Sequence, residues 1–201
     1  AMAAGVLVVS DGAGGIEFTR SGSARAAPLV EGANILAGSV DYNGADRFRS
    51  YVVATSVSGS DTASGDATRV RAEATDLGVR RESRVLIIRP ETGLSTARAR
   101  VRGDWEARLR AARAETVAIT VQGWLQPDGS PWPVNALCPV QAPGLGVQGT
   151  LLISQAEYSI SASGQTARLQ LVRPDAFQPE PRAVVRNPTR KAAAPVGDVV
   201  P

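Results

Sequence analysis

Short strand-like segments separated by tight turns fill the second half of the chain, and this pattern restricts the possible folds most strongly. Residues 116–126 read TVAITVQGWLQ and place Val117, Ile119 and Val121 on one face, as in a half-buried strand. Three more strand-like segments follow turn-forming sequences, at 134–141, 150–161 and 166–174. Antiparallel strands with short connections predict a β-sandwich or a small β-barrel.

One segment has the period of a helix instead. In STARARVRGDWEARLRAARAE, apolar residues recur at spacings of three and four, at Ala97, Val101, Trp105, Leu109 and Ala112. This spacing predicts an amphipathic helix over 95–114 with these residues on its buried face. Gly103 lies inside that helix and destabilises it by about 1 kcal/mol relative to alanine. The expected fold is therefore mainly β with α+β elements, a small antiparallel β-barrel with one inserted helix.

The first half gives weaker signals. Residues 5–20 read GVLVVSDGAGGIEFTR, which predicts a hairpin, because DGAGG supplies residues that tolerate positive φ. Further strands are expected at 34–43, 47–57 and 84–90. Residues 21–33 and 59–68 are small and polar, as in loops, and 69–84 show no clear period. Proline and alanine dominate after residue 176, so 176–201 is expected to be an extended or disordered tail.

Composition excludes several classes of site. The chain has no histidine and one cysteine, Cys138. Ser-His-Asp and Cys-His catalysis are therefore impossible, as are histidine-based zinc sites and an intrachain disulfide. We expect no catalytic residues, no cofactor and no metal, and an inert, buried Cys138 thiol. No apolar run approaches the ~20 residues that span a bilayer, so no membrane insertion is expected.

Arginine is the main source of positive charge. The 22 basic residues include a single lysine, Lys191, and 19 acidic residues leave a net charge of only +3. Arginines are concentrated in the predicted helix and at Arg80 and Arg81. A DNA-binding helix neutralises phosphates with such residues on one side, but here they are spread around the polar arc and partly balanced by acids. A nucleic-acid-binding module is the alternative function, and the less favoured one.

Two of the three tryptophans, Trp124 and Trp132, flank the turn PDGSP. Tryptophans beside a turn fill a core, anchor a protein interface or stack on a sugar. A sugar platform needs polar partners gathered beside the ring, so a carbohydrate-binding domain is a third reading. We expect Trp124 and Trp132 in or near subunit contacts, together with Arg80 and Arg81, and leave a core role open. Trp105, on the apolar stripe of the helix, is expected in the core.

The order of segments resembles the C-terminal half of the baseplate hub proteins of Mu-like contractile-tailed phages. The resemblance begins at LVVSDGAGGIEFTRSGSARA and continues through LVEGANILAGSVDYNGADRFRSYVV and ATDLGVRRESRVLIIRPE. It is most specific in RGDWEARLRAARAETVAITVQGWLQPDGSPWPVN and ends with GLGVQGTLLISQAEYSISASGQTARLQLVRPDAF. Nearly all of residues 6–177 are covered.

The resemblance implies a structural role in a homotrimeric ring that joins the tail tube to the central membrane-piercing spike. Expected partners are further copies of the chain, the spike protein, and tail tube and other baseplate proteins. The expected location is the virion baseplate, after assembly in the host bacterial cytoplasm. The implied domains are a remnant of a middle α+β region over 1–45, a C-terminal β-barrel over 46–175 and the tail.

Overall fold

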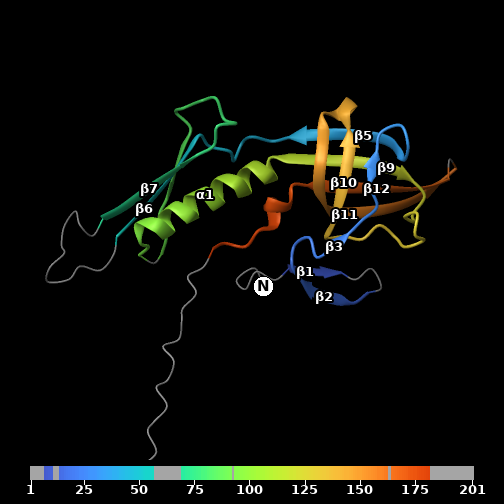
Figure 1. Ribbon diagram of the computed structural model, residues 1–201, viewed down its shortest axis with the longest axis horizontal. Coiled ribbons are helices and arrows are strands. Elements are labelled where there is room, and N and C mark those ends of the chain that lie inside the picture. Colours follow the sequence, from blue (N-terminus) through green and yellow to red (C-terminus); the bar gives the residue numbers. More distant parts are fainter. Residues whose placement is uncertain (1–6, 11–13, 57–68, 92, 163, 182–201) are drawn as a thin grey trace, which may run out of the picture.

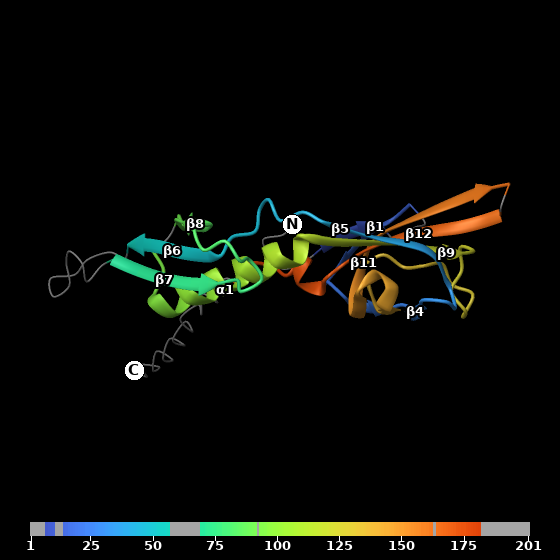
Figure 2. The ribbon, with the colours of Figure 1, turned by 90° about the horizontal axis from the view of Figure 1, so that it is seen from above.

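The computed structural model describes residues 7–10, 14–56, 69–91, 93–162 and 164–181. These residues form two bodies that lie end to end, so the molecule is elongated (Figures 1 and 2). A strongly curved β-sheet makes up one body, and a helix on a smaller sheet makes up the other. The predicted fold class, mainly β with one helix, is confirmed.

The larger body is a seven-stranded sheet. Its strands are β3 (Ala24–Arg25), β4 (Leu29–Val30), β5 (Ile35–Tyr42), β9 (Glu115–Gln122), β10 (Ala136–Ala142), β11 (Val147–Ser161) and β12 (Gly164–Val172). They are arranged in the order β3-β10-β11-β12-β9-β5, with β4 beside β10. The two short strands run parallel to β10, and the other neighbours are antiparallel.

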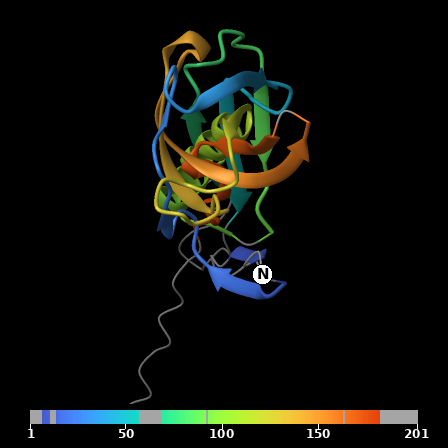
Figure 3. The same cartoon turned by 90° about the vertical axis from the view of Figure 1, so that its right-hand side faces the viewer.

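The concave face of this sheet holds the main hydrophobic core. Val117, Ile119 and Val121 are all buried, as their alternation predicts. Across the β9–β12 ladder they face Leu171, Leu169 and Ala167, which are buried too. The core is aliphatic apart from one tryptophan, because the chain has few aromatic residues to place in it. Figure 3 shows the strands wrapping around this core.

The expected barrel does not close through a strand ladder. Among the described residues, β5 and the β3/β4 side meet only where Glu31 bridges Ile35. The chain passes from one edge to the other in a tight turn, in which the amides of Ala33 and Asn34 donate to the Val30 carbonyl. Because this connection is a turn, it offers no strand that could hydrogen-bond to both edges and close the barrel. The turn η3 (Pro143–Leu145) covers the opening instead.

The covering turn is fixed at two points. The Gly144 amide donates to the Glu31 carboxylate over 2.7 Å, and the Leu145 side chain lies against Gly38 of β5. A Cβ at position 38 would overlap the Leu145 side chain, which would then have to shift. The sheet is therefore open in its hydrogen bonding and closed by side-chain packing.

The smaller body is a three-stranded sheet with one helix on it. It consists of β6 (Ser50–Ser56), β7 (Arg69–Thr75), β8 (Val85–Ile88) and α1 (Thr96–Arg113). Central β6 pairs antiparallel with β7 and parallel with β8. Strand β7 was not predicted, because its inward residues include two alanines, Ala72 and Ala74, rather than bulky β-formers. The helix agrees with the predicted range to within one residue at each end.

The buried face of α1 differs from the predicted stripe. Leu109 and Ala112 are buried as expected, but Ala97 and Val101 are exposed and Trp105 is half-buried. The face that packs on β6 and β7 carries small residues instead, at Ala99, Gly103 and Ala107. Small residues let a helix lie close to a sheet, and here this close approach decided the orientation more than apolar bulk.

Gly103 is the point of closest approach. A Cβ at this position would lie 3.2 Å from the Ala74 Cβ and 3.5 Å from the Tyr51 carbonyl oxygen. The residue that weakens the helix in isolation therefore allows it to pack.

We expect Gly103→Leu to lower the free energy of unfolding by about 1–3 kcal/mol, because the overpacked interface outweighs the gain in helix propensity. Arg100→Leu, at an exposed position of the same helix, is the matched control. It should change the free energy of unfolding by less than about 0.5 kcal/mol. Chemical denaturation of both variants measures the difference. Equal effects would show that the helix and sheet have room between them.

Two peripheral segments complete the described chain. The predicted hairpin is present as β1 (Leu7–Ser10) paired with β2 (Ile16–Thr19), although part of its turn lies outside the described residues. At the other end, η4 (Pro174–Phe177) and the residues up to 181 lie along α1. The remainder of the expected tail, from residue 182, lies outside the described residues.

Strands from both ends of the described chain meet in the larger sheet. Residues 24–42 contribute β3, β4 and β5 to the same sheet as β9–β12. The described residues between 50 and 113 form the separate three-stranded body. The chain thus enters the larger sheet, leaves it to build the smaller body, and returns through α1.

Candidate functional site

Trp132 lies in the core of the seven-stranded sheet. Its side chain is 4% exposed and belongs to the cluster that includes Val121 and Ala167. Its indole Nε1 is buried and has no hydrogen-bond partner in the described part of the chain. In the single subunit, this ring therefore serves as core.

Trp124 has a different environment, although only eight positions separate the two. It is partly exposed and makes an edge-to-face contact with Tyr158, with ring centroids 6.3 Å apart. Its Nε1 donates to the Ser159 carbonyl over 2.9 Å. The Tyr158 hydroxyl in turn donates to the Trp132 carbonyl over 2.7 Å. The β9–β10 connection is thereby tied to the β11–β12 hairpin.

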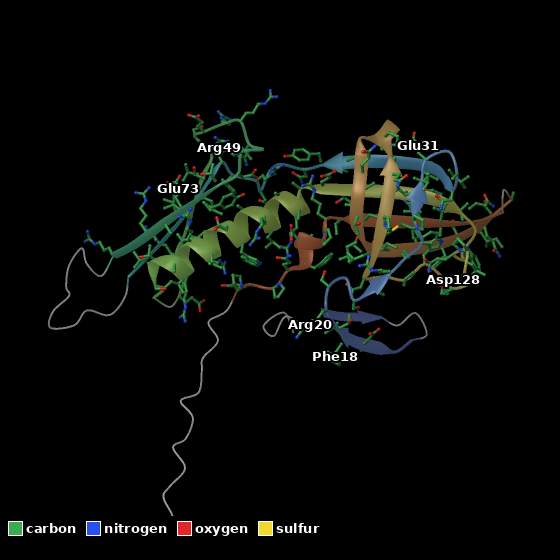
Figure 4. The ribbon with its side chains drawn as sticks, viewed as in Figure 1. Phe18, Arg20, Glu31, Arg49, Glu73 and Asp128 are labelled. Atoms are coloured by element: carbon green, nitrogen blue, oxygen red, sulfur yellow. The ribbon has the colours of Figure 1, made fainter. Side chains whose placement is uncertain are left out.

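The turn between the two tryptophans is ordered by its own polar groups. The Gln126 amide donates to the Ser130 carbonyl, and the Ser130 hydroxyl and amide donate to Asp128. These hydrogen bonds hold the pKa of the Asp128 carboxyl below its usual value. The side-chain oxygen of buried Gln126 accepts from the Ala27 amide. Figure 4 shows Asp128 at this end of the larger body, far from Arg49 on the smaller one.

Apolar side chains gather on the surface around Trp124. Leu125, Val134, Tyr158 and Ile160 are all exposed, and Ile160 is 70% exposed. They lie on the β9–β10 connection and near the tip of the β11–β12 hairpin. That hairpin projects past the rest of the molecule in Figure 2. Tyr158 and Ile160 were not among the residues predicted from the sequence, although their alternation with serines is typical of a strand with one apolar face.

Arg80 and Arg81 lie on the smaller body, so the structure does not bring them together with the tryptophans. Both are exposed, in the connection between β7 and β8. The connection begins at Asp76, whose carboxylate accepts two hydrogen bonds from Arg47, over 2.7 and 2.9 Å. These bonds fix the start of the connection. Leu77, the next residue, is exposed. The start of the β7–β8 connection is therefore fixed, while the side chains of Leu77, Arg80 and Arg81 face solvent.

The Arg47–Asp76 pair is largely shielded from water, with side chains 16% and 9% exposed. Burial disfavours the charged carboxylate, but hydrogen bonds from Arg47 and the Gly78 amide outweigh it. The pKa of Asp76 is therefore lowered in the folded chain. Opposite charges that hold each other in this way act as a fixed structural link.

Several arginines of α1 are engaged inside the subunit. Arg102 and Arg110 both pair with buried Glu106, and Arg102 also contacts Glu180. Arg113 donates to the Ala176 carbonyl. Side chains committed to such contacts are not aligned to neutralise a row of phosphates. The helix thus lacks the arrangement that the nucleic-acid reading requires.

The described residues contain no group of acidic, histidine or cysteine side chains that could hold a metal. Cys138 is buried, and burial raises the pKa of its thiol to about 12. The prediction of a buried cysteine is therefore confirmed. No helix within the described ranges is long and apolar enough to cross a membrane.

Comparisons with known proteins match this fold to phage tails. Residues 95–180 match the family model described as the fourth domain of the Mu phage baseplate assembly protein GpP. The chain is 30% identical over 182 residues to the baseplate hub protein gp44 of Escherichia phage Mu. That alignment covers 87% of this chain and 48% of the Mu protein.

Two solved structures of tail proteins share this fold. The 43 kDa tail protein of prophage MuSo2 from Shewanella oneidensis superposes with a TM-score of 0.70 at 29% identity, covering 87% of this chain and 50% of that protein. A tail protein from Neisseria meningitidis shares the fold, with a TM-score of 0.66 at 15% identity over 89% of this chain and 54% of that one. The chain thus spans about half the length of these relatives.

Proposed function

We propose that this chain, which is similar over most of its length to the baseplate hub proteins of Mu-like phages, is a structural part of a phage tail baseplate. The observation that carries the proposal is the match to the Mu hub protein over 87% of the chain. The family model falls on α1 and the strands that follow it, which are the elements that link the two bodies. The proposed location is the virion, after assembly in the host cytoplasm.

We further propose that the chain forms a homotrimeric ring that joins the tail tube to the central spike. The resemblance to hub proteins supports this arrangement, and so does the character of the surface. The described chain presents exposed apolar side chains and anchored loops, as a protein interface does. The proposed role is structural, without enzymatic activity, as in the hub proteins that the chain resembles.

Light scattering coupled to size-exclusion chromatography tests the ring. We expect a molar mass of three times 20.9 kDa, stable on dilution because obligate interfaces bury roughly 2,000 Å² or more. A strictly monomeric chain that also fails to capture the spike protein of its own phage would contradict the hub role.

A DNA-retention measurement separates the hub from the nucleic-acid reading. A phosphate-binding module loses affinity steeply as salt rises. We expect no salt-dependent retention, because the paired arginines of α1 hold intrachain partners. Strong retention at low salt that disappears with added salt would favour the alternative.

A further inference from the structure

The last described residues run along α1 in a fixed direction. They start at η4, which lies beside the last turn of the helix. Further on, the Trp105 indole donates to the Gln178 carbonyl, and Arg102 pairs with Glu180. Each contact lies nearer to the N-terminal end of α1 than the one before, and Figure 1 shows the segment passing beside the helix in that direction. The chain that follows Pro181 therefore starts beside the first turns of α1.

A groove lies at the place where this segment ends. It has a volume of about 820 Å³, which is within the range of pockets that enclose a drug-sized molecule. Its walls are the start of α1, the end of β8 with the connection that follows, and the last described residues. The apolar side chains that line it are Ile88, Leu94, Ala97, Val101 and Pro181. The groove therefore contains part of the apolar stripe of α1 that the small sheet leaves uncovered.

The next residues of the chain match the groove in length and chemistry. The helix rises about 7–8 Å between Ala97 and Arg102, and an extended chain covers that distance in two or three residues. Residues 182–185 read RAVV, so three small apolar side chains follow one arginine. Glu91 and Glu180 line the groove and carry the charge opposite to that of the arginine. The segment can therefore reach the apolar floor and bury its own apolar side chains there.

We propose that residues 182–185 dock in this groove, with their apolar side chains against Ala97 and Val101. The segment has an advantage over any separate partner, because it is joined to the groove at Pro181. A tethered segment binds at an effective concentration that is roughly millimolar, so modest contacts hold it. The docked segment extends the tie between the larger sheet, from which it comes, and the helix of the smaller body. This docking takes place within one chain and does not depend on the trimer proposed above.

Limited digestion of the complete chain with trypsin tests the docking. Arg182 begins the docked segment, and Arg190 lies beyond it, so one sample contains both the test site and the reference site. Cleavage follows the fraction of time that a site is undocked, provided that docking and undocking are fast. We expect cleavage after Arg182 to be about tenfold or more slower than cleavage after Arg190 in the wild type. Mass spectrometry of the products over time gives both rates.

Three variants identify the source of the protection. Val101→Asp places a charge on the floor of the groove and should bring the two cleavage rates together. Val85→Asp is the matched control, because Val85 is 48% exposed against 49% for Val101 and lies on the same body outside the groove. It should leave the ratio of rates unchanged. Val184→Ser alters the segment and leaves the groove intact, and it should speed cleavage after Arg182 as Val101→Asp does.

Three results would overturn the proposal. Equal rates at the two sites in the wild type would leave the groove for another partner, such as the half of the related hub proteins that this chain does not span. Slow cleavage after Arg182 that neither Val101→Asp nor Val184→Ser relieves would mean that the nearby folded body, and not docking, protects the site. Protection that rises with protein concentration would mean that the segment docks on a second copy instead of its own chain.

Discussion

Trp132→Ala is expected to lower the free energy of unfolding by about 3–5 kcal/mol. The side chain is almost fully buried in the core of the larger sheet, and truncation of such a ring leaves a cavity among aliphatic neighbours. In a chain of this size the loss lowers Tm by about 10 °C. Thermal unfolding followed by circular dichroism measures it.

Two further variants identify the cause of that loss. Trp132→Phe keeps most of the volume and removes the unpartnered indole N–H, so it should retain most of the stability. Trp124→Ala removes one edge-to-face contact and one hydrogen bond at a partly exposed site, and we expect about 1–2 kcal/mol. If Trp124→Ala were the more damaging of the two alanine variants, the assignment of core and surface roles would be reversed.

Asp76→Ala should destabilise the chain by about 3 kcal/mol. It leaves the Arg47 guanidinium largely buried without its bidentate partner, and an uncompensated buried charge is strongly unfavourable. Glu115→Ala is the control, because Glu115 pairs with Arg173, whose side chain is mostly exposed. That pair should contribute at most about 1 kcal/mol. Urea denaturation of both variants at neutral pH gives the comparison.

The same pair predicts a pH dependence. The pKa of Asp76 is lower in the folded chain than in the unfolded chain, so its ionised form favours folding. The contribution is complete above the unfolded pKa, about 4, and is lost as pH falls through the folded value. Asp76→Asn should therefore be less stable than the wild type at neutral pH, with the gap narrowing in acid. A gap that is constant with pH would rule out this origin.

Local pattern predicted the five longer strands of the larger body, because each one faces a single core. Strands β3 and β4 fall within residues 21–33, which were expected to be a loop, because two residues each are too few to show an alternation. The alternation in β9 identified Val117, Ile119 and Val121 correctly, and the serine and glycine residues between β11 and β12 marked their hairpin. The open edge could not be predicted in this way. Closure depends on the fit of Leu145 over Gly38, and this is a contact between residues far apart in the sequence.

The helix shows a limit of periodicity. Its spacing fixed the range, but two stripes run along α1, one with bulkier apolar residues at Val101 and Trp105 and one with small residues around Gly103. The sheet selected the small stripe, because β6 and β7 could then approach closely. Trp105 turned to the C-terminal segment instead, where its Nε1 donates to the Gln178 carbonyl over 3.1 Å. A pattern that counts only hydrophobicity overlooks this choice.

The junction between the two bodies gives the molecule its mechanical character. Helix α1 ends at Arg113 and β9 begins at Glu115, so one residue separates them. The outgoing connection from β5 to β6 is tied to the same place, since the Asn43 amide donates to the Ala114 carbonyl and Arg110 donates to the Asp46 carbonyl. With no slack at this joint, a load applied to the smaller body passes along the helix into the larger sheet. The subunit should behave as a strut, transmitting force by rotating as a whole rather than by bending.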